Sequence, residues 1–150
     1  MSSDNNLRAA INLIIQASIE GKPRHEPLLT VCETPQYLID HGFPQLPVSI
    51  TGAVIDKVHF DHGITKGTLE RLGEIICNPR SLYKSATKDG AAVVVTFEMK
   101  NGSPILVPLH PNKQVGRSTY VNLVASMYHK EPAIETRWEA QGLLLWKATK

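Results

Sequence analysis

Apolar residues recur at helical spacing in the first half of the chain. The pattern over residues 1–21 predicts an amphipathic helix that ends at a glycine. A short apolar run at 28–33 predicts a strand. Two more helices are expected at roughly 51–61 and 66–76, joined at Gly63, which suits the end of a helix, with Thr65 well placed to cap the second. The first half is therefore expected to be mainly helical.

The pattern changes to a period of two after Pro79. The run AAVVVTFEM alternates like a strand, and Asn101-Gly102 is a strong hairpin-turn signal before a second run, SPILVPLH. RSLYKSA before this hairpin is expected to be an edge strand, and LLLWKAT near the end of the chain is expected to be the last strand after a helix in EPAIETRWEAQG.

The strand expected in TYVNLVASMYHK carries polar groups at alternate positions. Strict alternation would place Asn122, Ser126, Tyr128 and Lys130 on one face, with only Val124 among them. The usual interpretation of such a face is solvation. A hydroxyl, a phenol and an ammonium along one strand are also groups that bind and polarise a phosphodiester.

Helices followed by an antiparallel meander predict an α+β fold. We expect N-terminal helices packed on one face of a four- or five-stranded antiparallel sheet. With 150 residues, 42% of them hydrophobic, the chain suits a single core. We therefore expect an N-terminal amphipathic helix over 1–21 and one domain over 22–150.

Charge and cysteine content exclude only a few classes of function. The net charge of +2 is well below that of a protein that coats duplex DNA. Cys32 and Cys77 lie far apart and predict neither a disulfide framework nor a metal knuckle. The longest apolar runs, about five residues, are far below the ~20 needed to cross a bilayer, and no secretion signal is recognisable. A cytoplasmic protein without membrane association is expected.

Two histidines three residues apart lie in KVHFDHGIT, residues 57–65. A zinc site on His59 and His62 would need further ligands, and the sequence has no recognised metal-binding spacing. The simplest interpretation is a basic helix end, since the helix dipole favours histidine there and Gly63 ends the helix. An acid/base role stays open. We expect no metal and no cofactor.

Other catalytic motifs are absent from the sequence. Ser126 lies in neither a GxSxG nor an SxxK motif, so a serine hydrolase is not expected. No phosphate-binding glycine loop is present either. Arg117, in the loop before the polar strand, is equally compatible with a phosphate clamp and with a surface charge.

Four segments in order resemble the phage MuF C-terminal domain, which belongs with the phage-associated barnase/EndoU/colicin/RelE-like nucleases. They are TVCETPQYLIDHG, the run from ITGAVIDKVHFDHG to NPRSLYKS, VVVTFEMKNGSPILVPLH and YVNLVASMYHK. The resemblance covers roughly residues 28–147. Its most specific parts are Lys57-x4-His62-Gly63, Asn78-Pro79 and Asn122-x3-Ser126-x-Tyr128-x-Lys130.

The resemblance implies a small RelE/barnase-like fold and a metal-independent ribonuclease, deployed as a toxin in conflicts between phages, plasmids and bacteria. The family's histidine falls on His62 and its strand hydroxyl on Ser126, accompanied by Lys57, Tyr128 and Lys130. RNA, either tRNA or mRNA, would be the substrate. A cognate antitoxin or immunity protein and delivery into a target cell are further expectations of this kind.

The expected chemistry is general acid/base cleavage of RNA. His62 would exchange a proton with the substrate, and Ser126 and Tyr128 would donate hydrogen bonds to the scissile phosphate. Lys57, Lys130 and Arg117 would bind phosphate. The alternative is a non-catalytic module that binds protein or RNA on the same fold; the sequence does not fix the oligomeric state.

Overall fold

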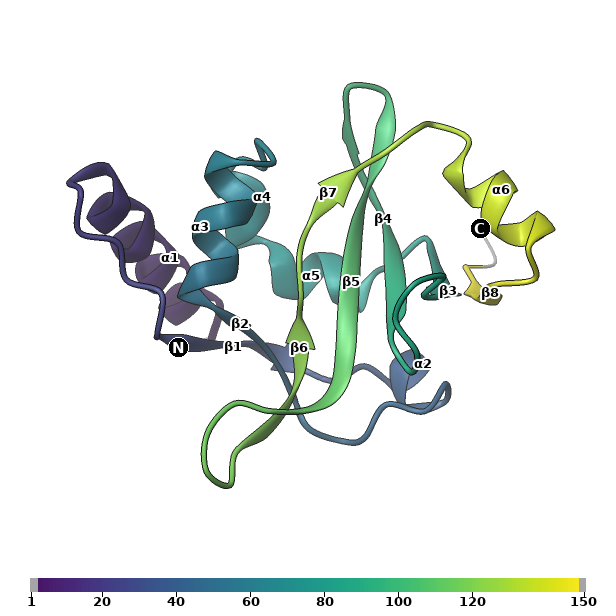
Figure 1. The fold of residues 1–150 in the computed structure, drawn as a ribbon, viewed down its shortest axis with the longest axis horizontal. Coiled ribbons are helices and arrows are strands. Elements are labelled where there is room, and N and C mark those ends of the chain that lie inside the picture. The colour runs from purple at the N-terminus through teal and green to yellow at the C-terminus, as the bar shows by residue number, and fades with distance from the viewer. Residues whose placement is uncertain (1–2, 149–150) are drawn as a thin grey trace.

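A computed structural model describes residues 3–148 (Figure 1). The helices are α1 (Ser3–Ile19), α2 (Gln36–Ile39), α3 (Gly52–Phe60), α4 (Lys66–Glu70), α5 (Leu72–Cys77) and α6 (Ile134–Ala140). The strands are β1 (Leu28–Glu33), β2 (Pro47–Thr51), β3 (Ser81–Lys84), β4 (Ala92–Lys100), β5 (Ser103–Gln114), β6 (Tyr120–Val124), β7 (Tyr128–His129) and β8 (Leu144–Lys147).

All eight strands join one mixed sheet. Seven of them follow the order β1-β2-β6-β5-β4-β3-β8, and β7 pairs with β5 beyond the end of β6. Every pairing is antiparallel except that of β2 with β6, which is parallel. The long strands β4 and β5 form the centre, and the short β7 continues the line of β6 along β5 (Figure 1).

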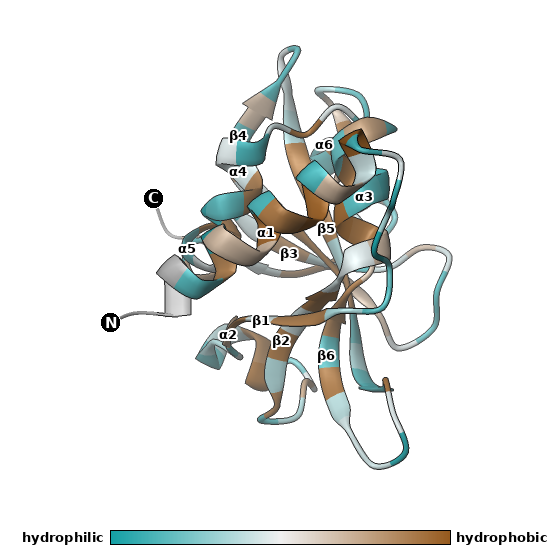
Figure 2. Cartoon of the chain, turned by 90° about the vertical axis from the view of Figure 1, so that its left-hand side faces the viewer, coloured by the Kyte–Doolittle hydropathy of each residue, from teal (hydrophilic) through white to brown (hydrophobic). Residues whose placement is uncertain are grey.

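Helices cover both faces of this sheet. Alternate residues of β5 separate the faces: Ile105 and Val107 belong to the main core with α1, α3, α4 and α5, whereas Leu106 belongs to a second cluster with α6. Within that second cluster, α6 contributes Ile134 and Trp138. Figure 2 shows the apolar colour concentrated along the central strands and on the helices that lie over them.

The expected α+β arrangement is wrong in its sheet and in its layers. The sheet has eight strands and a parallel pair, and helices lie on both of its faces rather than on one. One reason is β2, a five-residue strand that leads directly into α3, so its apolar residues merge with the helical pattern that follows. Val48 and Ile50 in β2 are fully buried.

The expected edge strand and the expected single polar strand also differ from the structure. β3 is an inner strand because β8 pairs with it. The segment 119–130 breaks into β6 and β7: Val124 pairs with Leu109 and Tyr128 pairs with Leu106, so four residues on one strand oppose three on the other. One extra residue reverses the facing of every later side chain. Tyr128 therefore faces the α6 side, whereas Val124 faces the main core.

Local turn signals were predicted correctly. Asn101 and Gly102 both have positive φ, 53° and 81°, as a hairpin turn of type I′ requires. Gly63 has φ 69° just past α3. Thr65 caps α4 by accepting a hydrogen bond from the Thr68 amide at 3.2 Å.

Candidate active site at the edge of strand β7

His62 links the end of α3 to the open edge of β7. The amide of His62 donates to the Lys57 carbonyl at 3.3 Å, which holds the turn after α3, and its side-chain Nδ1 lies 2.8 Å from the Met127 carbonyl oxygen. Because a carbonyl can only accept, Nδ1 carries the hydrogen of this bond. In the neutral ring Nε2 is then an unprotonated acceptor, as a general base requires.

Tyr128 lies beside this imidazole. The two ring centroids are 6.3 Å apart with the planes at 77°. Burial raises the pKa of the Tyr128 phenol, so the hydroxyl stays protonated and remains a hydrogen-bond donor at neutral pH. Lys130 Nζ lies 5.9 Å from the centre of the Tyr128 ring. The structure therefore brings together an imidazole base, a phenol and an ammonium group.

Ser126 lies in the same segment, between β6 and β7, next to the residue whose carbonyl binds His62. Its side chain is half-buried and makes no hydrogen bond to any residue among 3–148. Its hydroxyl is thus available to a ligand.

Asn122, the first polar residue of the predicted strand face, does not face this site. Its side chain is fully buried and donates to the Thr34 hydroxyl at 2.7 Å and to the Pro44 carbonyl at 2.9 Å. Its Oδ1 accepts from the Asn112 amide at 3.1 Å. Asn122 is therefore a structural residue that ties β6 to the segments beside it.

Two of the predicted phosphate ligands do not lie beside the Tyr128 ring: Arg117 is far from it along the sheet, and the Lys57 side chain is exposed to solvent. Arg117 is in the turn of the β5–β6 hairpin, at the opposite end of β5 from β7 (Figure 1). The distance along β5 from the partner of Tyr128, Leu106, to Gln114 at this turn is roughly 25 Å. The side chain of Lys57, on α3, is exposed, and the bond from Lys57 to His62 is made by its backbone carbonyl.

The other histidine of the pair serves the loop. His59 Nδ1 donates to the Ile64 carbonyl at 2.8 Å and so fixes the segment that carries His62. The two histidines thus bond to different partners. Among residues 3–148, no group of three or more His, Cys, Asp and Glu side chains is placed to hold a metal ion.

Sequence reasoning missed Lys100 at the tip of the β4–β5 hairpin. A Cβ added to Gly63 would lie 3.3 Å from both Cε and Nζ of Lys100, so this ammonium rests against the turn that carries His62. No carboxylate among residues 3–148 pairs with it. The only signal was a lysine before a hairpin turn, which does not reveal that the tip reaches the α3 loop.

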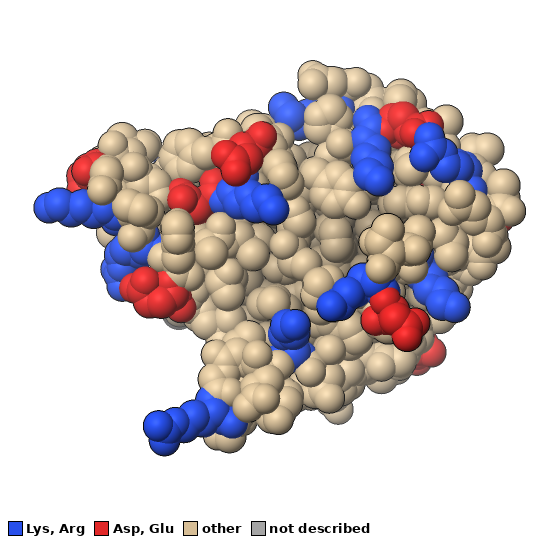
Figure 3. Space-filling view, viewed as in Figure 1, with Lys and Arg blue, Asp and Glu red and all other residues tan. Residues whose placement is uncertain are grey.

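Basic side chains on the face seen in Figure 3 are scattered among acidic ones around a largely uncharged centre. Such a surface suits contacts to individual phosphates better than the coating of a long duplex. None of the helices in the described part of the chain is long and apolar enough to span a membrane.

The model of the family described as the phage MuF-C-terminal domain matches residues 54–150, which include His62, Lys100, Ser126, Tyr128 and Lys130. No curated protein and no solved structure matches.

Proposed function

The chain belongs to the phage MuF C-terminal domain family, and we propose that it is a metal-independent endoribonuclease with the site of catalysis at His62. The observation that carries the proposal is the bond from His62 Nδ1 to the Met127 carbonyl, which leaves Nε2 as an acceptor beside Tyr128. Assignment to the phage-associated barnase/EndoU/colicin/RelE-like nucleases is part of this proposal and is supported by the positions of His62 and Ser126.

Cleavage of RNA without a metal begins at the ribose 2′-hydroxyl. His62 Nε2 takes the proton of this hydroxyl, and the oxygen attacks the adjacent phosphorus. The imidazolium that forms keeps its Nδ1–H bond to Met127, and that carbonyl dipole stabilises the positive charge. The bond to the 5′-oxygen then breaks, this oxygen takes a proton from solvent, and the products are a 2′,3′-cyclic phosphate and a 5′-hydroxyl; the imidazolium returns its proton to solvent afterwards.

Negative charge accumulates on the phosphate during this step and requires donors. Tyr128, kept protonated by the raised pKa of its phenol, donates a hydrogen bond to the phosphate or to the departing 5′-oxygen. Ser126, with its free hydroxyl, is a second donor. Lys130 and Lys100 supply positive charge, since Lys130 lies over the Tyr128 ring and Lys100 rests against Gly63, next to His62.

A toxin role supplies the biological setting of the proposal. The RNA substrate would be tRNA or mRNA, and a cognate antitoxin or immunity protein would block the site. Expression in a bacterial host is expected to arrest growth, and Ser126→Ala is expected to relieve the arrest. High-level expression of the wild type without any growth defect would instead favour a non-catalytic module that binds protein or RNA.

The direct test is cleavage of total tRNA and mRNA by the purified protein in EDTA. His62→Ala is expected to lose activity by a factor of about 10² or more, the range for removal of a general base. The matched control is His41→Ala, which removes an imidazole that also donates to a backbone carbonyl, that of Tyr37 at 2.7 Å, in the segment just after α2. Abolition of wild-type activity by EDTA, or full activity in folded His62→Ala, would remove the mechanism.

A further inference from the structure

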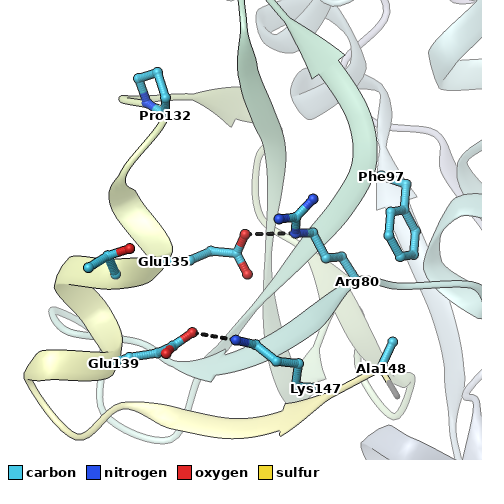
Figure 4. A pocket seen from close by; sticks show the side chains of 8 residues that line it. Arg80, Phe97, Pro132, Glu135, Glu139, Lys147 and Ala148 are labelled. Atoms are coloured by element: carbon cyan, nitrogen blue, oxygen red, sulfur yellow. Dashed lines mark hydrogen bonds and ion pairs between the residues drawn. The ribbon is translucent and has the colours of Figure 1, made fainter. Parts of the chain in front are cut away.

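A hollow lies on the α6 face of the sheet, away from the α3 loop. It encloses about 510 Å³, and its walls include Arg80, Phe97, Glu135, Glu139 and Lys147. Figure 4 shows Glu135 and Glu139 reaching from α6 toward Arg80 and Lys147, with Arg80 lying between Glu135 and the Phe97 ring. None of these residues takes part in the chemistry proposed at His62.

The charges in this hollow are balanced. Arg80 Nε pairs with Glu135 at 2.8 Å, and Lys147 Nζ pairs with Glu139 at 2.7 Å. Two cations and two carboxylates leave no net charge among these four groups, so they exert little electrostatic attraction on a free phosphate. The hollow therefore suits a ligand that is neutral and polar.

Its unused hydrogen-bonding groups are of both kinds. The two terminal amino groups of Arg80 make no hydrogen bond to residues 3–148, so part of the guanidinium fork is open. Glu139 accepts from Tyr83 at 2.9 Å and from Lys147 through Oε2 alone, which leaves Oε1 without a partner among the same residues. The Lys147 and Tyr83 hydrogen bonds hold the pKa of Glu139 below its ordinary value, so this oxygen belongs to a charged carboxylate.

The remaining wall is aromatic. Phe97 is 53% exposed, so its ring is open to contact with a ligand in the hollow. Aromatic rings of this kind stack on nucleobases. An arginine fork matches the adjacent O6 and N7 acceptors of guanine, and a carboxylate oxygen matches the N–H donors of that base, whereas adenine presents an amino donor in place of O6.

We infer that this hollow, hereafter the α6 pocket, binds a guanine base of the RNA substrate, stacked on Phe97 and read by Arg80 and Glu139. The inference rests on the proposed ribonuclease function and deepens it. Tyr128 and the α6 pocket lie on the same face of the sheet. Phe97 is on β4, two strands from β7 in the order β7-β5-β4, so the lateral separation is roughly 10 Å. A single strand stacked at about 3.4 Å per nucleotide covers this distance within about three nucleotides.

The test measures binding of guanosine 3′-monophosphate and adenosine 3′-monophosphate to the full chain by calorimetry. We expect the guanine nucleotide to bind at least about tenfold more tightly than the adenine nucleotide. Phe97→Ala is expected to weaken binding of the guanine nucleotide by roughly tenfold through the loss of stacking. Met99→Ala is the matched control, because Met99 is also exposed on β4, at 56%, but does not line the α6 pocket. Equal binding of the two nucleotides, or an unchanged affinity in Phe97→Ala, would overturn the inference.

A second arm uses RNA oligonucleotides that differ only by guanine or adenine near the cleavage site. Faster cleavage of the guanine substrate, lost in Phe97→Ala and kept in Met99→Ala, supports the α6 pocket as an RNA subsite. Cleavage without base preference overturns the subsite while the ribonuclease function stands. Binding of the free guanine nucleotide without any RNA cleavage overturns the ribonuclease function and the RNA subsite together, and leaves a site for the free nucleotide.

Discussion

Replacing Asn122 by alanine is expected to destabilise the fold strongly, although the residue is polar and lies on a short strand. Its amide is fully buried and makes three hydrogen bonds, to Thr34, Pro44 and Asn112. Alanine removes all three and leaves the Pro44 carbonyl and the Asn112 amide without these partners. Thr34 is less affected, since its hydroxyl also donates to the Leu46 carbonyl.

The size of the effect follows from these contacts. A buried hydrogen bond contributes about 1 kcal/mol net, and a partner left unsatisfied costs about 1–3 kcal/mol. Three lost bonds, with a small cavity in place of the amide, give a loss of roughly 3–4 kcal/mol. This is a large part of the ~5–15 kcal/mol by which domains are stable. With a urea slope near 2 kcal/mol/M, the unfolding midpoint would fall by about 1.5–2 M.

The assay is urea unfolding followed by circular dichroism, with wild type, Asn122→Ala and the control Asn6→Ala. Asn6 is exposed on α1, so its replacement is expected to change stability by less than about 0.5 kcal/mol. A loss below about 1 kcal/mol in Asn122→Ala, at an unchanged slope, would refute the structural role assigned to this side chain.

Three further predictions concern buried groups elsewhere in the fold. Ser49, 1% exposed, has an Oγ without a partner among residues 3–148, whereas Ser81 donates to a carboxylate of α6 at 2.7 Å. In urea unfolding, the free energy of unfolding should rise by about 1 kcal/mol in Ser49→Ala and fall by about 1–2 kcal/mol in Ser81→Ala. Equal effects of the two substitutions would contradict this prediction. Gly52→Ala would place Cβ 2.3 Å from a backbone oxygen, so it should lower the thermal midpoint and reduce the free energy of unfolding by at least about 2 kcal/mol. Gly67→Ala, whose added Cβ has its nearest atom at 4.0 Å, should be neutral or stabilising. A Gly52→Ala variant as stable as the wild type would refute the close approach. Burial, and then a hydrogen bond to a carboxylate, raises the pKa of the Tyr83 phenol above its ordinary value. The stability that the protonated phenol contributes is therefore complete below about pH 10 and falls at higher pH by up to about 1.4 kcal/mol per pH unit. Tyr83→Phe should reduce this fall in urea unfolding between pH 9 and 11, and an unchanged dependence of stability on pH would contradict the prediction.

Signals that act within a few residues were readable from the sequence. The Asn101-Gly102 turn, the Thr65 cap and the glycine that ends α3 depend on local backbone geometry, and the structure has all three. For the candidate site, the sequence singled out His62 and Tyr128 without giving their separation, and the structure places the two ring centroids 6.3 Å apart.

The pairing of strands that lie far apart in the chain could not be predicted from the sequence. The parallel pairing of β2 with β6 joins Val48 to Asn122, far along the chain, and no short pattern encodes it. A one-residue bulge between Val124 and Tyr128 reverses the strand face, because alternation predicts facing only while the register is kept. The approach of Lys100 to Gly63 depends on how far a hairpin extends past the sheet, which the turn signal leaves open.

In the proposed reaction, His62 takes the proton of a ribose 2′-hydroxyl. The most direct measurement is single-turnover cleavage, in EDTA, of an RNA oligonucleotide and of the same oligonucleotide with one 2′-deoxy residue at the mapped cleavage site. The wild type is expected to yield a 2′,3′-cyclic phosphate and a 5′-hydroxyl from the first oligonucleotide and no cleavage at the deoxy position of the second. His62→Ala is expected to be slower by about 10² or more, while the control His41→Ala is not. Cleavage at the deoxy position, or His62→Ala as fast as the wild type, would contradict the proposed reaction.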